Sequence, residues 1–193
     1  MHIDMKTQVR FDRQTWYYDY IRMTDDKELK CSHFLKDFIF QHRVRYMVYF
    51  RTSQNTSNKL VRLFCEYKLF RLCRKYGIEI KTKTKIDPGF VMIHPYNITI
   101  SPSAVIGRNV NIYKGATIGL SGGKHPGAPE IGNSVQIGIN STIIGGVKVG
   151  NDVLIAPNTL VNQDIPDHSI VIGNPCKIIP RENATGQYVY YKV

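Results

Sequence analysis

Two histidines of this chain have a backbone conformation that is restrained by the residue after them. His94 and His125 are each followed by proline, which restricts the conformation of the preceding residue. The other histidines lie in a terminal arm, a helical segment or a turn, where surface and packing roles are common: His2, His33, His42 and His168. An imidazole titrates near neutral pH, so it can take the proton of a hydroxyl that attacks a thioester. His94 and His125 are therefore the candidate catalytic histidines.

A six-residue repeat begins after Gly77 and would position both histidines. Aliphatic residues recur at a step of six in two registers: Ile100, Ile106, Ile112 and Ile118, then Ile131, Ile137, Ile143, Val149, Ile155 and Val161. Fixed-period self-similarity is typical of a solenoid. A β-sandwich would instead show period-two alternation with turns every 8–12 residues. The repeat predicts a mainly β protein whose residues 78–180 form a parallel β-helix.

Each hexad makes one short strand and one corner, so three hexads complete a triangular coil of about 18 residues. Glycine and asparagine accept the positive φ that such corners need. Glu79 precedes His94 by 15 residues, which places it one layer away and within a hexad of vertical alignment. Glu79 could therefore orient the base as a carboxylate partner. An exposed corner residue is the alternative interpretation.

One coil is interrupted by the Gly- and Pro-rich segment 119–130, which contains His125. An insertion between stacked coils must protrude, and loops on rigid scaffolds are favoured places for function. An unimportant surface excursion remains the alternative. We expect a functional loop at 119–130.

Residues 1–77 are predicted to form an α-helical N-terminal part. From Lys27 to Lys75 the apolar residues recur at three- and four-residue steps, with Lys and Arg between them. The polar stretch 52–58 predicts a helix break with an N-cap, and Gly77 predicts a C-terminal cap. We expect two or three helices here without a catalytic constellation, and a C-terminal tail at residues 181–193.

The net charge of +11 is concentrated at the N-terminal end. Through Ile78 there are 16 Lys and Arg against 8 Asp and Glu, or +8; the remainder has 10 against 7, or +3. A basic, aromatic surface could meet nucleic acid, an acidic glycan or an anionic membrane. A solvated helix face is the commoner explanation. No nucleic acid partner is therefore expected, while peripheral membrane contact stays open.

The four cysteines form no CxxC pair, and no signal peptide is visible at the N-terminus. Free thiols in a reducing, cytoplasmic setting are therefore expected. No apolar run approaches the roughly 20 residues that span a bilayer.

Three features together resemble the serine acetyltransferase family of hexapeptide-repeat acyltransferases. They are the hexads, the Gly-Gly-Lys-His-Pro of the interrupted coil, and the Ile-Gly-Asn-Pro-Cys-Lys-Ile of residues 172–178. The resemblance covers roughly residues 76–179, and the short helical part is similar to that of polysaccharide O-acetyltransferase-like members. It implies a left-handed parallel β-helix, acetyl-CoA as acetyl donor, no metal, and a homotrimer that could pair into a dimer of trimers.

The resemblance also implies roles for residues that match by position. His94 matches the general base, and Glu79 stands where the family has the aspartate that orients it. His125 matches a loop histidine that helps to hold the acceptor, and Lys124 replaces an arginine that contacts the substrate carboxylate. Acetyl-CoA would lie in a groove between subunits, at positions around Gly119, Gly138, Ile139, Ala156 and Pro157, with Lys177 near its phosphates.

Two departures from the family change the expected acceptor. Ile93 stands where the family has an aspartate for the amino group of serine, and an apolar residue cannot pair with an ammonium. Lys124 loses the bidentate carboxylate recognition of an arginine. We therefore expect another hydroxyl, such as a sugar of a surface polysaccharide or its precursor. The alternative is a serine O-acetyltransferase of cysteine biosynthesis.

Two further classes can be weighed against this hypothesis. Zinc carbonic anhydrases with a left-handed β-helix need three histidines, two of them a few residues apart. The next histidine after His125 is His168, so the coils hold no such pair. A non-catalytic trimeric scaffold would need none of His94, Glu79 and His125, so their presence argues against it.

Overall fold

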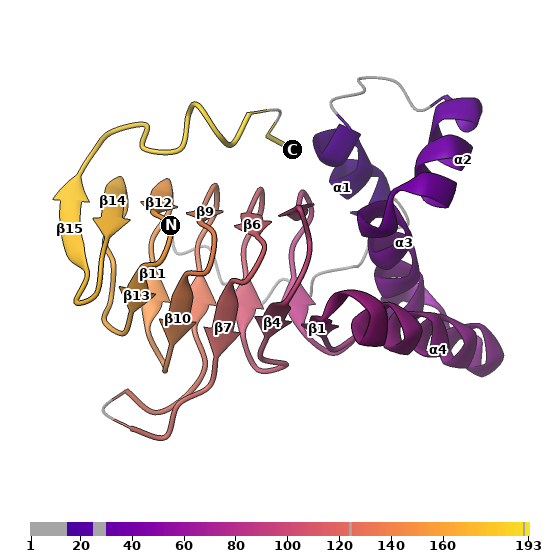
Figure 1. Cartoon of the computed structure of the whole chain (residues 1–193), viewed down its shortest axis with the longest axis horizontal. Coiled ribbons are helices and arrows are strands. Elements are labelled where there is room, and N and C mark those ends of the chain that lie inside the picture. The colour runs from indigo at the N-terminus through magenta and orange to yellow at the C-terminus, as the bar shows by residue number, and fades with distance from the viewer. Residues whose placement is uncertain (1–14, 25–29, 124, 191) are drawn as a thin grey trace, which may run out of the picture.

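The computed structural model describes residues 15–24, 30–123, 125–190 and 192–193. Helices come first, at α1 (Thr15–Thr24), α2 (Cys31–Phe40), α3 (His42–Asn55) and α4 (Lys59–Tyr76). A left-handed β-solenoid of about five turns follows (Figure 1). Spacing predicts two or three helices, whereas the described part of the chain has four. α1 precedes residues 27–75, whose spacing predicts helices, and α2 is capped by Gln41 without a glycine or proline to mark its end.

The ends of α4 follow the sequence signals. The Asn58 side chain accepts hydrogen bonds from the N–H groups of Leu60 and Val61, which satisfies donors at the helix start. Gly77 adopts the left-handed conformation at φ 69° and donates its N–H to the carbonyl of Cys73. Because a side chain is strained at this φ, glycine is the natural C-terminal cap. The N-cap and the C-terminal cap are both as expected.

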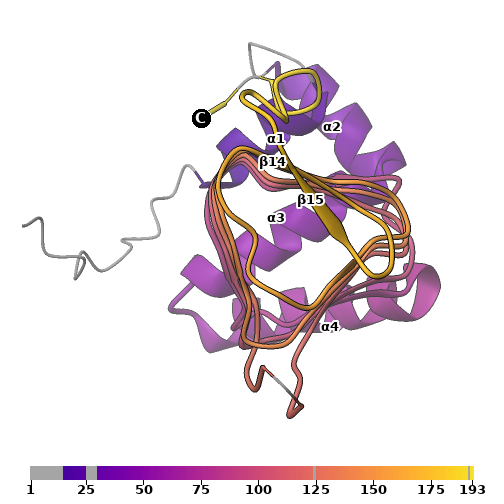
Figure 2. The same cartoon turned by 90° about the vertical axis from the view of Figure 1, so that its left-hand side faces the viewer.

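The strands form three sheets, which are the three faces of a triangular prism (Figure 2). Face A consists of β1 (Ile78–Ile80), β4 (Ile98–Ile100), β7 (Thr117–Gly119), β10 (Thr142–Ile144) and β13 (Leu160–Val161). Face B consists of β2 (Lys85–Ile86), β5 (Val105–Ile106), β8 (Glu130–Ile131) and β11 (Lys148–Val149). Face C consists of β3 (Val91–Ile93), β6 (Asn111–Tyr113), β9 (Gln136–Ile137), β12 (Val153–Ile155), β14 (Ser169–Ile172) and β15 (Lys177–Pro180). Only the β14–β15 pair is antiparallel among the described strand pairs, so the predicted parallel β-helix is confirmed.

The hexad aliphatic residues point inward and stack coil on coil. Ile106, Ile112, Ile118, Ile137, Ile143 and Ile155 are all fully buried. β-Branched side chains suit this position because they pack well on the pleated inner surface of a strand. The core of the solenoid is therefore a continuous aliphatic column.

The corner between faces C and A has a repeating backbone ladder. Asn97, Gly115, Asn140 and Asn158 all take positive φ there, between 53° and 74°. Each coil bonds to the next, since Gly115 donates to Tyr96, Asn140 to Lys114 and Asn158 to Ile139. We call this edge the C–A corner. Its asparagines and glycine allow the same tight turn in successive coils.

A buried ion pair fixes the helices to the first coil. The Nε of Arg51 lies 2.8 Å from a carboxylate oxygen of Asp19, and both side chains are fully buried. Asp19 also accepts hydrogen bonds of 2.8 Å from the N–H groups of Gly89 and Phe90. Arg51 donates to the carbonyls of Ile86 and Asp87. Helices α1 and α3 thereby cover the open end of the solenoid.

The C-terminal tail runs back over face C towards α1 (Figure 1). Its first anchor is Asp152, which accepts hydrogen bonds from Ala184 N–H and from both the N–H and the hydroxyl of Thr185. Further along, Asn111 donates to the carbonyl of Tyr188. Val193 exchanges two hydrogen bonds with the side chain of Asn109. The described part of residues 181–193 is therefore a strap over face C.

Candidate functional site

His94 stands on a two-residue insertion in the C–A corner. Ile93 pairs with Tyr113, and Thr99 pairs with Thr117. Six steps lead from Ile93 to Thr99 but only four from Tyr113 to Thr117, so this coil holds two extra residues, which we assign to His94 and Pro95. His94 is exposed and takes φ 49°, in the left-handed region that side chains seldom adopt. Unusual backbone of this kind gathers at functional sites, so His94 remains a candidate for a functional role.

The helical part braces this bulge through His42. The Nε2 of His42 lies 3.3 Å from the carbonyl oxygen of Pro95. Its ring stacks on Tyr76 at 4.1 Å between centroids and 16° between planes, and it lies 5.1 Å from the ring of Tyr96. Burial lowers the pKa of His42, although the bond to Pro95 raises it, so the neutral ring donates through Nε2. No spacing in the sequence could indicate this contact, because 53 residues separate the partners.

Glu79 lies on the outer surface of face A. It pairs with Thr99 of the next coil, five positions after His94, so the expected one-layer offset is confirmed. The Glu79 side chain is exposed and helps to line a groove of about 510 Å³ with Cys73 of α4. Among the described residues of one protomer, no hydrogen bond joins Glu79 to His94. The orienting role of Glu79 stays a prediction.

The protruding loop leaves the solenoid at the other edge of face A, between β7 and β8 (Figure 1). Ser121 and Gly127 exchange two backbone hydrogen bonds that close its base. The carbonyl of His125 accepts from the N–H of Gly146, and the imidazole is partly buried. Lys124 lies outside the described residues. Within one protomer, His94 and His125 are therefore on opposite edges of face A.

Most of the predicted acetyl-CoA positions follow the C–A corner above His94. Gly138 and Ile139 occupy one coil, and Ala156 and Pro157 the next. A Cβ on Gly138 would lie 2.6 Å from the nitrogen of Pro157, so only glycine allows the coils to stack there. Lys177 pairs with Ile172, which places it at the far end of the same edge. Five strand spacings of about 4.8 Å separate β3, which precedes His94, from β15, which carries Lys177, or roughly 24 Å. Gly119 lies instead at the base of the loop.

Metal-binding side chains do not cluster in the described part of the chain. No group of three His, Cys, Asp or Glu residues is arranged to hold an ion there. His168 bonds through Nδ1 to Asp152 at 2.9 Å and supports the strap, as its expected structural role requires. The absence of a metal from the active protein stays a prediction.

The repeats and the triangular coils define a hexapeptide-repeat solenoid. Residues 128–163 match the family described as bacterial transferase hexapeptide (six repeats). The chain is similar to Serine acetyltransferase 2 of Arabidopsis thaliana, with 37% identity over 111 residues, which are 56% of this chain and 34% of the relative. It is also similar to the serine acetyltransferase of Staphylococcus epidermidis, with 37% identity over 108 residues, or 55% of this chain and 50% of the relative.

Solved serine acetyltransferases share the fold. The enzyme from Brucella abortus strain S19 has a TM-score of 0.73 at 23% identity, covering 89% of this chain and 70% of that one. The enzyme from Neisseria gonorrhoeae in complex with serine has a TM-score of 0.70 at 22% identity, covering 86% and 68%. The chain spans between a third and a half of the length of the curated relatives described above. These relatives are named serine acetyltransferases, and none of those described is named a polysaccharide O-acetyltransferase.

Proposed function

We propose that this protein is an acetyl-CoA-dependent O-acetyltransferase with His94 as its general base. The observation that carries the proposal is the bulge of His94 and Pro95, which presents an exposed imidazole at the foot of the C–A corner. Serine acetyltransferases are similar in sequence over the solenoid and similar in fold over most of this chain. Assembly of coils alone does not require a histidine on an inserted pair of residues.

The chemistry follows from what an imidazole can do at this position. His94 takes the proton of the acceptor hydroxyl while the hydroxyl oxygen attacks the thioester carbonyl. Backbone N–H groups near the corner would stabilise the resulting oxyanion. The carbon–sulfur bond then breaks, and the imidazolium returns its proton to the departing CoA thiolate. The products are the acetyl ester and free CoA.

Acetyl-CoA would lie extended along the C–A corner, with its thioester at His94. Gly138, Ile139, Ala156 and Pro157 present backbone rather than bulky polar side chains to it. Lys177 is exposed at the far end, where its ammonium could pair with a phosphate. Gly119 would line the pocket from the loop side of a neighbouring protomer.

A trimer through face A would complete the site. Outward side chains on face A are mostly uncharged. Thr99, Thr117, Thr142 and Leu160 are aligned with Glu79, one in each successive coil. Face B exposes charged residues, and face C carries the strap. A threefold axis in front of face A would bring the loop of one protomer, with His125, to the His94 edge of the next. Light scattering should report three protomers, and a smaller particle for Thr117→Arg.

The relatives favour serine as the acceptor, which is the alternative that the sequence left open. The sugar acceptor is the second candidate, because Ile93 is a partly buried apolar residue beside the base. A thiol-release assay with acetyl-CoA, L-serine and a panel of sugars separates the two. Turnover of L-serine alone supports the cysteine-biosynthesis role, and turnover of a sugar alone supports the other. Release of CoA with neither acceptor class above the rate of hydrolysis would contradict the acetyltransferase proposal.

A further inference from the structure

Helix α4 has apolar residues on two opposite sides. Cys65 and Leu69 are buried against the rest of the molecule. The opposite side carries large apolar residues that are 51–77% exposed: Leu60, Leu63, Phe64, Tyr67 and Phe70. Their steps of three and four residues form one stripe along the helix. We call these five residues the outer stripe.

Basic side chains accompany the outer stripe. α4 contains six of them, Lys59, Arg62, Lys68, Arg71, Arg74 and Lys75, against Glu66 alone, a net charge of +5. Three cations stand over rings of the stripe one turn earlier, at 5.2 Å for Lys68 over Phe64, 6.0 Å for Arg71 over Tyr67 and 5.7 Å for Arg74 over Phe70. The surface thus presents rings and cations together.

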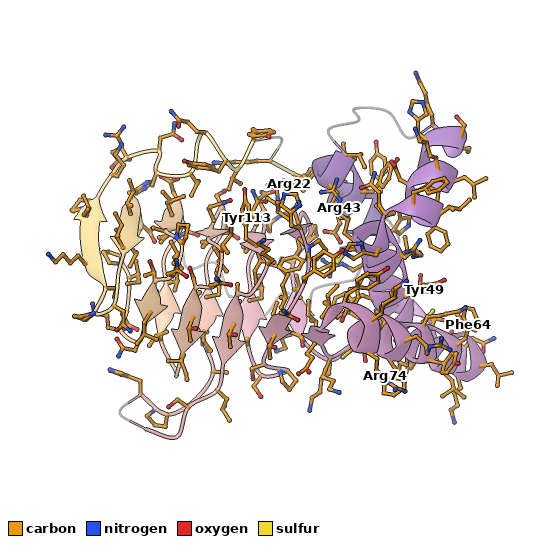
Figure 3. All side chains as sticks on the ribbon, viewed as in Figure 1. Arg22, Arg43, Tyr49, Phe64, Arg74 and Tyr113 are labelled. Carbon is orange, nitrogen blue, oxygen red and sulfur yellow. The ribbon has the colours of Figure 1, made fainter. Side chains whose placement is uncertain are left out.

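The position of α4 leaves this surface open. The helix lies across the end of the molecule, away from the coils (Figure 1). Figure 3 shows Phe64 towards the end of α4 that points away from the coils, and Arg74 nearer the first coil. A continuous apolar stripe in water is unfavourable, and such patches mark contact sites. Phe64 makes an edge contact with the ring of Tyr49 on α3, at 6.2 Å between centroids, yet all five side chains of the outer stripe remain more than half exposed.

The charge of α4 selects among the occupants that could cover the outer stripe. A second copy of α4 would bring +5 against +5, which opposes close pairing. A nucleic acid would use the cations but would leave the aliphatic Leu60 and Leu63 without an apolar partner. An anionic lipid surface serves both, since headgroups pair with the cations while apolar side chains enter the interface. None of the described helices is long and apolar enough to cross a bilayer, so α4 would lie on its surface.

We propose that the outer stripe of α4 docks on a membrane that contains anionic lipid. The helix lies in the interface with Leu60, Leu63 and Phe64 inserted, and Arg71 and Arg74 hold lipid phosphates. α4 ends at Tyr76, directly below Tyr96 in the C–A corner. Docking therefore brings the corner that carries His94 close to the lipid headgroups. The inference does not depend on the proposed acetyl transfer.

The test is sedimentation of the full chain with vesicles of phosphatidylcholine, with and without phosphatidylglycerol. The wild type should sediment with the anionic vesicles and remain in solution with the neutral ones, and added salt should weaken binding. Arg71→Gln/Arg74→Gln should weaken partitioning about 25-fold, at about fivefold for each basic residue removed. Leu60→Ser/Leu63→Ser should weaken it at least about tenfold.

A matched control comes from α2, which also exposes aliphatic residues but carries little net charge. Leu35→Ser/Ile39→Ser should bind anionic vesicles as the wild type does. The proposal is overturned if this control loses binding equally, if the wild type ignores anionic vesicles, or if neutral vesicles bind it as strongly. It is also overturned if Leu60→Ser/Leu63→Ser changes the particle mass without vesicles, because a second copy would then cover the outer stripe.

Discussion

The imidazole of His42 lies 3.3 Å from the carbonyl oxygen of Pro95, the residue that follows His94. This contact joins the first residue of α3 to the inserted pair in the C–A corner. The rings of Tyr76 and Tyr96 hold His42 from two sides, so the imidazole has little freedom to leave. We therefore infer that His42 is a positioning residue, which holds the peptide that follows the proposed base His94.

Removing this contact should slow the proposed reaction without removing the proposed base. His42→Ala should lower kcat about tenfold and change KM little, because a loose base fails mainly in the transition state. His42→Gln keeps a donor for Pro95 and should recover most of the loss. If the alanine and glutamine variants were equally slow, the hydrogen bond would not be the cause. Near-UV circular dichroism checks that α3 remains packed.

The proposed base, His94, gives the second prediction. His94→Ala should lower kcat/KM at least about a hundredfold, the usual scale for general-base catalysis. The fold should persist, because His94 is exposed and lies in an insertion between paired positions. His33→Ala, in α2 and remote from the C–A corner, is the matched control and should keep wild-type kinetics. If His94→Ala were nearly as active as His33→Ala, His94 would not be the general base.

The contrast between coils and helices explains what the sequence could predict. The inward position of Ile106 and Ile112 can be predicted, because both occupy the aliphatic position of the six-residue repeat. Asp19 and Arg51 show no such signal, since their pairing joins α1 to α3 and then to Gly89 across the first coil. The bulge at His94 has a local signal, because Met92 and Ile100 both point inward but are eight residues apart instead of six, a two-residue slip in the register.

The aliphatic column gives a paired prediction within one strand. Ile106 points inward and is fully buried, whereas its neighbour Val105 points outward from face B and is 40% exposed. Ile106→Ala should lower the free energy of unfolding by about 2–5 kcal/mol because it leaves a cavity between coils. Val105→Ala should change it by less than about 1 kcal/mol. Urea unfolding measures both, and equal losses would contradict the inward assignment.

Breaking the buried ion pair of Asp19 and Arg51 is expected to destabilise the folded protein. Asp19→Ala should lower the free energy of unfolding by about 3–5 kcal/mol, because it leaves Arg51 charged and buried alone. Asp19→Leu/Arg51→Met should recover part of the loss, since no charge is then buried. The recovery is incomplete because the N–H groups of Gly89 and Phe90 still lack an acceptor. A double variant weaker than Asp19→Ala would contradict this account.

The strap over face C should depend on pH through Asp152 and His168. Burial alone would raise the pKa of Asp152, but hydrogen bonds from Thr185, His168 and Ala184 lower it to about 2. The bond to Asp152 raises the pKa of His168 above its usual 6.5. A lowered carboxylate pKa stabilises the strap above about pH 3.8 and loses this effect as the pH falls towards 2. A raised imidazole pKa stabilises it below about 6.5, and this effect fades as the pH rises through the folded value.

Amide hydrogen exchange at Thr185 and Val189, corrected for intrinsic rates, should therefore show the greatest protection at mildly acidic pH. His168→Gln removes the titrating ring, so protection should stop falling on the alkaline side while the acid loss persists. Asp152→Asn keeps the shape but loses the charge and an acceptor for two donors, so protection should be lower at every pH. Protection that follows pH identically in all three proteins would show that other groups hold the strap. Protection depends on two opposite titrations because the carboxylate of Asp152 bonds both to the imidazole of His168 and to Thr185 of the tail.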